Sequence, residues 1–181
     1  MQRLFVALSV PDVVAQAMAL IQNGVPGARW QTRGQLHLTL RFIGEVDGRD
    51  AAMIDDALAG IDAPRFTLEP HGVGQFGNKH PHALWAGVRM NEALLHLQRK
   101  VETAVQRAGQ EPDRGKYTPH VTLARLNRPN VGRVMDYLTD HALFTAPPFE
   151  VEEFVLYSSV LTSDGSIYAP ERVYPLHTSP T

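Results

Sequence analysis

Two short motifs of histidine and threonine are the residues of this sequence best suited to chemistry. His37-Leu38-Thr39-Leu40 recurs 83 residues later as His120-Val121-Thr122-Leu123. Successive side chains of a β-strand point to opposite faces, so each motif predicts an imidazole and a hydroxyl on one face and aliphatic residues in a core. A lone histidine in a strand is usually a surface or core residue. A duplicated His-x-Thr on the polar phase of matching strands favours a functional pair instead.

Two imidazoles and two hydroxyls that converge in one cleft suit phosphoryl chemistry. Attack of water on a cyclic phosphodiester needs a base for the water and an acid for the leaving ribose oxygen, on opposite sides of phosphorus. Histidine titrates near neutral pH and can serve either role, so His37 and His120 are the candidate pair, with neither role assigned by the near-symmetric motifs. Thr39 and Thr122 can hydrogen-bond the non-bridging oxygens, and Arg125 can stabilise their charge. A regular strand would put Arg125 on the aliphatic face, so a bulge or a strand end is needed to turn it into the cleft.

The segments around the motifs also repeat. Arg3–Leu8 and Ala83–Val88 are both short β-type runs, and each precedes an amphipathic helix. Pro64–Glu69 resembles Pro147–Glu152 at the same offset of 83 as the histidine motifs. We therefore predict a single bilobal domain over residues 1–181, built by an internal duplication of about 1–82 and 83–181, with possible exchange of strands between the lobes.

The order of elements predicts an α+β fold. Each copy is expected to contain a strand, a helix, the motif strand, a helix and a further strand, without a strict βαβ alternation. The second copy has the clearest helix, with Asn91 as its N-cap and Gly109 as its stop signal. We expect two pseudo-symmetric lobes, each a mainly antiparallel sheet with outer helices, and an active-site cleft between the sheets. The strand order does not follow from this pattern.

Composition limits the classes of function. Cysteine is absent, which excludes disulfides, thiolate metal sites and a cysteine nucleophile and is compatible with a reducing cytoplasm. The net charge of −2 favours a small ligand or a nucleic-acid end over the coating of long nucleic acid. A local basic patch nevertheless lies between Asp113 and Arg133, with five basic residues against Asp113 alone. No run approaches the length of a membrane span, and the apolar run Leu4–Val10 is interrupted too early for a signal peptide.

The chain resembles the two-histidine phosphoesterase superfamily, and more narrowly the bacterial and archaeal RNA 2′,3′-cyclic phosphodiesterases, historically called 2′-5′ RNA ligases. The resemblance covers nearly the whole chain. It rests on both motifs together with these matching segments: Arg3–Ala7, Trp30, Leu40–Gly44, Pro119–Arg125, Ser159-x-Leu161, Gly165-x-x-Tyr168 and Tyr174–Leu176.

The resemblance implies an enzyme that opens 2′,3′-cyclic phosphates on RNA 3′ ends to 2′-phosphates without a metal or cofactor, with His37 as proton donor and His120 as proton acceptor. A monomer in the cytoplasm is expected. Reversible 2′-5′ RNA ligation would share the same site. The alternative is a non-catalytic binder of RNA ends, which the two intact His-x-Thr motifs disfavour because a binder need not keep both proton-transfer groups.

Aromatic residues near the motifs are further candidates for substrate contact. Trp30 and Phe42 could stack a base at the mouth of the cleft, although Phe42 falls on the aliphatic phase and could equally pack in the core. Tyr117, where the family more often has phenylalanine, has a weaker claim. A metal site at the nearby histidines 71, 80 and 82 is disfavoured, because no carboxylate lies between them, and a polar hairpin tip is the preferred interpretation.

Overall fold

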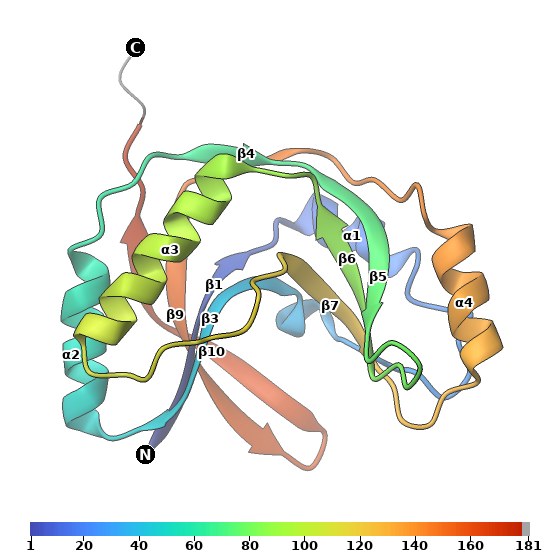
Figure 1. Cartoon of the computed structure of the whole chain (residues 1–181), viewed down its shortest axis with the longest axis horizontal. Coiled ribbons are helices and arrows are strands. Elements are labelled where there is room, and N and C mark those ends of the chain that lie inside the picture. Colours follow the sequence, from blue (N-terminus) through green and yellow to red (C-terminus); the bar gives the residue numbers. More distant parts are fainter. Residues whose placement is uncertain (179–181) are drawn as a thin grey trace.

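The computed structural model describes residues 1–178, over which the chain forms ten strands, four α-helices and one 3₁₀ turn (Figure 1). In chain order they are β1 (Gln2–Ser9), α1 (Asp12–Ala19), β2 (Arg29–Trp30), the 3₁₀ turn (Arg33–Gln35), β3 (His37–Val46), α2 (Gly48–Ala59), β4 (Phe66–Leu68), β5 (Pro70–Phe76), β6 (Ala83–Val88), α3 (Glu92–Arg107), β7 (His120–Arg125), α4 (Val131–Asp140), β8 (Phe149–Val151), β9 (Glu153–Thr162) and β10 (Gly165–Pro175). The predicted α+β class is confirmed.

The main sheet consists of two half-sheets that meet at the motif strands. Its order is β10-β9-β1-β3-β7-β6-β5, with β2 added beside β7, and all neighbours are antiparallel. The two halves are joined by a single residue pair, Leu38 with Val121, which occupy the same place in the two motifs. The sheet therefore opens where β3 and β7 diverge, and the two histidines lie next to this junction.

Strands from the two halves of the sequence pair reciprocally. β9 adds to β1 in one half-sheet, and β5 adds to β6 in the other. The registers match, because Arg3 opposes Ser159 and Ala83 opposes Phe76, which are the corresponding positions of the two copies. The small β4–β8 sheet also pairs the copies with each other, with Thr67 opposite Glu150. These pairings support the inferred duplication and exchange of strands, which remain proposals about the origin of the chain.

The helices cover the aliphatic face of the sheet. α1, α2 and α3 contribute side chains to one buried cluster with β1 and β3, and α4 packs in a second cluster with β6 and β7. The predicted ends of α3 are confirmed: the Asn91 side chain accepts a hydrogen bond from the Leu94 N–H, and Gly109 follows the helix with φ +98°. None of the helices in residues 1–178 has the length and apolarity needed to cross a membrane.

Candidate active site

A β-bulge in each motif strand decides which side chains enter the cleft. In the β1–β3 pairing the register skips Leu40, and in the β6–β7 pairing it skips Leu123. Each skipped residue and the residue after it are both buried, so the alternation of faces shifts by one position. Phe42 and Arg125 therefore share a face with the histidines. The bulge that the Arg125 prediction required is present, and Phe42, at 51% exposed, lies in the cleft and not in the core.

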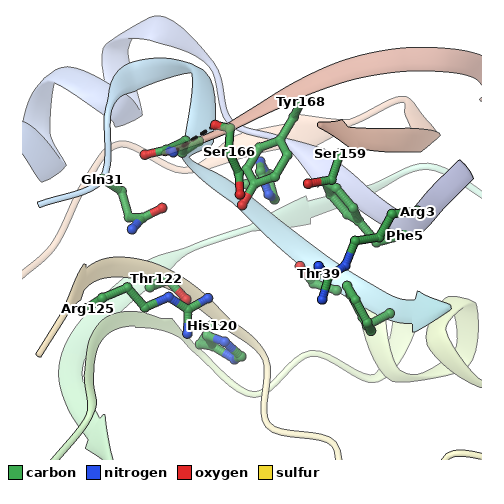
Figure 2. Close-up of a pocket in the computed structure, with 13 residues that line it drawn as sticks. Arg3, Phe5, Gln31, Thr39, His120, Thr122, Arg125, Ser159, Ser166 and Tyr168 are labelled. Atoms are coloured by element: carbon green, nitrogen blue, oxygen red, sulfur yellow. Dashed lines mark hydrogen bonds between the residues drawn. The ribbon is translucent and has the colours of Figure 1, made fainter. Parts of the chain in front are cut away.

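One cavity of about 230 Å³ collects the motif residues from both half-sheets (Figure 2). It is lined by the predicted residues His37, Thr39, Phe42, His120, Thr122 and Arg125, and also by Arg3, Phe5, Gln31, Gln35, Ser159, Ser166 and Tyr168. Two guanidinium groups face this space, and none of the residues lining it carries a carboxylate. The cavity is therefore suited to an anion.

His37 is surrounded by aromatic rings. Phe5 and Tyr157 stack on the imidazole with ring centroids 5.0 and 5.6 Å away, and Tyr168 meets it edge-on at 4.9 Å. Burial among these rings lowers the pKa of His37 from 6.5 to about 4, because desolvation disfavours the charged form. In the free protein at neutral pH the imidazole is uncharged, and its protonation requires a compensating negative charge nearby.

His120 differs from His37 in having a polar partner. Its Nδ1 lies 2.7 Å from the Thr118 carbonyl oxygen, which can only accept a hydrogen bond. Nδ1 therefore carries the hydrogen, and the neutral ring has a lone pair on Nε2. Desolvation lowers the pKa of His120; the Thr118 carbonyl opposes this effect, and the positive charge of Arg125 adds to it. An imidazole fixed in this tautomer is suited to accept a proton at Nε2.

The segment between α3 and β7 is held against β3 by polar contacts, several of them to the buried Arg41 side chain. The Arg41 side chain pairs with Glu102 of α3 (Nε to Oε2, 2.6 Å) and donates to the Glu111 carbonyl. Glu102 in turn accepts a hydrogen bond from the Asp113 N–H at 2.7 Å. Tyr117 lies further along this segment, and its hydroxyl donates to the Thr39 carbonyl at 2.9 Å. Tyr117 therefore anchors the segment to the motif strand and does not line the cavity, in contrast to its predicted contact with substrate.

Comparison with known protein families identifies the family of the chain. The model of the 2′-5′ RNA ligase superfamily matches residues 10–161, most of the chain. The chain belongs to this superfamily.

Individual relatives align over almost their full length. An RNA 2′,3′-cyclic phosphodiesterase of Archaeoglobus fulgidus is 32% identical, over 95% of this chain and 99% of its own. One of Thermotoga maritima is also 32% identical, over 92% of this chain and 91% of its own. Among solved structures, a Thermus thermophilus protein has a TM-score of 0.79 at 27% identity, with 98% of this chain and 100% of its own covered. The E. coli LigT protein in complex with 3′-AMP has a TM-score of 0.79 at 25% identity, with 97% of this chain and 98% of its own covered.

Trp30, a candidate for base stacking, lies on the other face of the sheet. In β2 the side chains alternate, and Trp30 pairs with Ala124, which is buried on the helix side. Its ring packs 5.9 Å from that of Tyr137 of α4. Trp30 therefore packs α4 on the sheet, and it also borders the neighbouring cavity between β2 and the β9–β10 turn. The aromatic residues that line the histidine cavity are Phe5, Phe42 and Tyr168, of which Phe42 was a predicted candidate.

Several cavity residues escaped the sequence prediction. Gln31 directly follows the short β2 strand and Gln35 ends the 3₁₀ turn, two elements that carry no periodic pattern. Arg3 and Phe5 share one face of β1, and this alternation could have suggested them once the partner of β1 was known. Arg3 also lies over the Phe42 ring, with its Cζ 5.4 Å from the centroid. Ser159 and Tyr168 belong to segments that carried the family resemblance, but they had been given no role.

The histidines of the β5–β6 hairpin do not assemble a metal site. Within residues 1–178, no cluster of three or more His, Asp or Glu side chains has the arrangement needed to hold a metal ion. His82 stacks on Phe76, with ring centroids 6.4 Å apart, and Phe76 packs edge-on against His120 at 4.8 Å. The hairpin thus contributes the aromatic side chains that pack against His120.

Proposed function

We propose that this chain hydrolyses the 2′,3′-cyclic phosphate at RNA 3′ ends and leaves a 2′-phosphate, by acid–base catalysis without a metal. The observation that carries this proposal is the cavity itself, in which one histidine from each half-sheet, two threonines and two arginines surround a space that no carboxylate lines. The names of the relatives from Archaeoglobus fulgidus and Thermotoga maritima support the same reaction.

The proposed reaction uses the two imidazoles in different roles. His120 takes a proton from water through Nε2, because its Nδ1–H is engaged with the Thr118 carbonyl. The water oxygen attacks phosphorus, and the bond from phosphorus to the ribose 3′ oxygen breaks. Protonated His37 gives its proton to that oxygen, so a 3′ hydroxyl and a 2′-phosphate result. Attack by the 5′ hydroxyl of a second RNA in place of water would be the 2′-5′ ligation, with the same residues.

The threonines and Arg125 stabilise the negative charge of the phosphate in this scheme. The hydroxyls of Thr39 and Thr122 are placed to donate hydrogen bonds to the non-bridging oxygens, and Arg125 stabilises the charge that grows on them. The bound phosphate also supplies the negative charge that His37 needs, because an anion beside an imidazole raises its pKa. The proton donor is thus charged when substrate is present.

We also propose that the protein acts as a monomer in the cytoplasm. The two half-sheets of a single chain supply both histidines, both threonines and Arg125, which is compatible with a monomer. The absence of cysteine is compatible with a reducing compartment.

The test is a product assay on short RNAs that end in a 2′,3′-cyclic phosphate, with the product identified as a 2′- or a 3′-phosphate. His37→Ala and His120→Ala should each lower kcat by at least about 10², the usual share of a general acid or base. Because the pair acts as a unit, the double variant should be little worse than either single variant. A single variant with near wild-type turnover, or a wild-type protein that binds the RNA without opening the ring, would overturn the proposal.

A further inference from the structure

A second cavity adjoins the histidine cavity, and no role has been given to it so far. Its volume is also about 230 Å³, and it lies between β2 and the turn of the β9–β10 hairpin. The two cavities share five lining residues, Gln31, Gln35, Arg125, Ser166 and Tyr168, so they lie directly next to each other. Arg29 lines only the second cavity.

Arg29 and Arg125 are directly opposite each other in the β2–β7 pairing. Opposite residues of an antiparallel pair point to the same face, with Cβ atoms roughly 4.5–5.5 Å apart, and like charges in this position are destabilising. Neither arginine forms an ion pair with any residue of the described range 1–178, although Asp164 lines the same cavity. Two arginines that line one cavity from opposite positions of a strand pair, neither of them in an ion pair within that range, create a site for more than one negative charge.

The Arg29 side chain is directed across the second cavity toward the hairpin. A Cβ atom placed on Gly165 would lie 3.3 Å from the Arg29 Nη2 atom, so the guanidinium reaches the turn that begins β10. The hairpin is fixed on the same side, because the Gln35 side-chain amide donates to the Ser166 carbonyl at 2.9 Å (Figure 2). The Arg29 guanidinium therefore lies beside the hairpin turn in the second cavity, which Arg125 also lines but Arg3 and Phe42 do not.

We propose that Arg29 binds the internucleotide phosphate on the 5′ side of the terminal nucleotide, one step along the RNA from the reacting phosphate at Arg125. This inference rests on the proposed function. A mononucleoside 2′,3′-cyclic phosphate offers only the reacting phosphate. Every RNA of two or more nucleotides also carries an internucleotide phosphate next to the reacting end. Arg29 thus makes the enzyme selective for RNA chains over free cyclic nucleotides.

The test compares Arg29→Gln with wild type on three ligands: adenosine 2′,3′-cyclic phosphate, the dinucleotide ApA with the same cyclic end, and that dinucleotide with a neutral methylphosphonate linkage. Wild-type kcat/KM should be higher for the charged dinucleotide than for the other two. Arg29→Gln should lower kcat/KM by roughly tenfold for the charged dinucleotide and leave it unchanged for the other two ligands. A tenfold loss is the expected effect of removing one charge-assisted hydrogen bond. The matched control is Arg99→Gln, which removes an exposed arginine of α3 that lines neither cavity and should change none of the three values.

A binding measurement separates this inference from the proposed reaction. Affinities for adenosine 2′-phosphate and for ApA ending in a 2′-phosphate need no turnover, and Arg29→Gln should weaken only the second. If wild type opens none of the cyclic ends, the proposed reaction fails, and the binding difference still decides the role of Arg29. If Arg29→Gln weakens the mononucleotide and dinucleotide equally, or neither of them, the inference about Arg29 is overturned.

Discussion

The aromatic surroundings of His37 predict that this one side chain makes the fold sensitive to mild acid. The pKa of His37 is lowered to about 4 in the folded protein by burial, against 6.5 as the ordinary value. The unfolded chain therefore binds a proton at His37 at a higher pH than the folded chain does. Stability that is present above pH 6.5 is lost as the pH falls toward 4.

The size of the effect follows from these two pKa values. The whole difference between the two pKa values corresponds to a loss of about 3 kcal/mol in the free energy of unfolding. This full loss is reached only below pH 4. Between pH 7 and pH 5, the protonation of His37 in the unfolded chain should reduce the free energy of unfolding by about 2 kcal/mol. His37→Gln removes the titrating group, so the variant should lose about 2 kcal/mol less than wild type over this interval, whatever its stability at pH 7.

The assay is denaturant unfolding of both proteins at pH 7 and pH 5. Thr39→Ala is the matched control, because Thr39 lines the same cavity but does not titrate, so this variant should keep the wild-type pH dependence. All other titrations are common to the three proteins and cancel. Equal losses of unfolding free energy for wild type and His37→Gln would refute the reasoning, because they would show that the folded protein protonates His37 as easily as the unfolded chain.

Four further outcomes are expected. Arg125→Ala should lower kcat by about 10²–10³, the effect of losing one donor to a developing negative charge, whereas Arg99→Gln should not; steady-state kinetics distinguish these cases. Tyr117→Phe should cost about 1 kcal/mol in denaturant unfolding, because the Thr39 carbonyl loses its hydrogen bond. Glu102→Gln should cost about 3 kcal/mol in the same measurement, since its buried arginine partner loses the counter-charge. Dialysis against EDTA should leave turnover intact; loss of activity that Zn²⁺ or Mn²⁺ restores would contradict an acid–base mechanism.

The candidate site could be predicted from the sequence because its residues stand in short local patterns. His37, Thr39, His120 and Thr122 stand in two motifs whose period-2 alternation already separates a polar face from an aliphatic one. The α3 helix ends where its capping residues predict, at Asn91 and Gly109. These features depend on neighbours within a few residues, and such neighbours are visible in a single sequence.

Only the tertiary structure decided which other side chains join the motifs. The bulges at Leu40 and Leu123 turn Phe42 and Arg125 into the cleft, and a bulge depends on the partner strand, which the sequence does not name. Trp30 lies on the helix face because a two-residue strand pairs beside β7 in one particular register.

The distinction between the two histidines is also a product of the fold. The motifs are nearly identical, so their local sequences give both imidazoles the same properties. Pairing of β1 with β9 and β10 with β9 surrounds His37 with Phe5, Tyr157 and Tyr168, while the turn before β7 places the Thr118 carbonyl on Nδ1 of His120. Desolvation and a fixed tautomer come from groups that are distant in sequence or set by backbone geometry. For that physical reason only the folded chain distinguishes the two imidazoles, and the proposed roles of proton donor and proton acceptor rest on that difference.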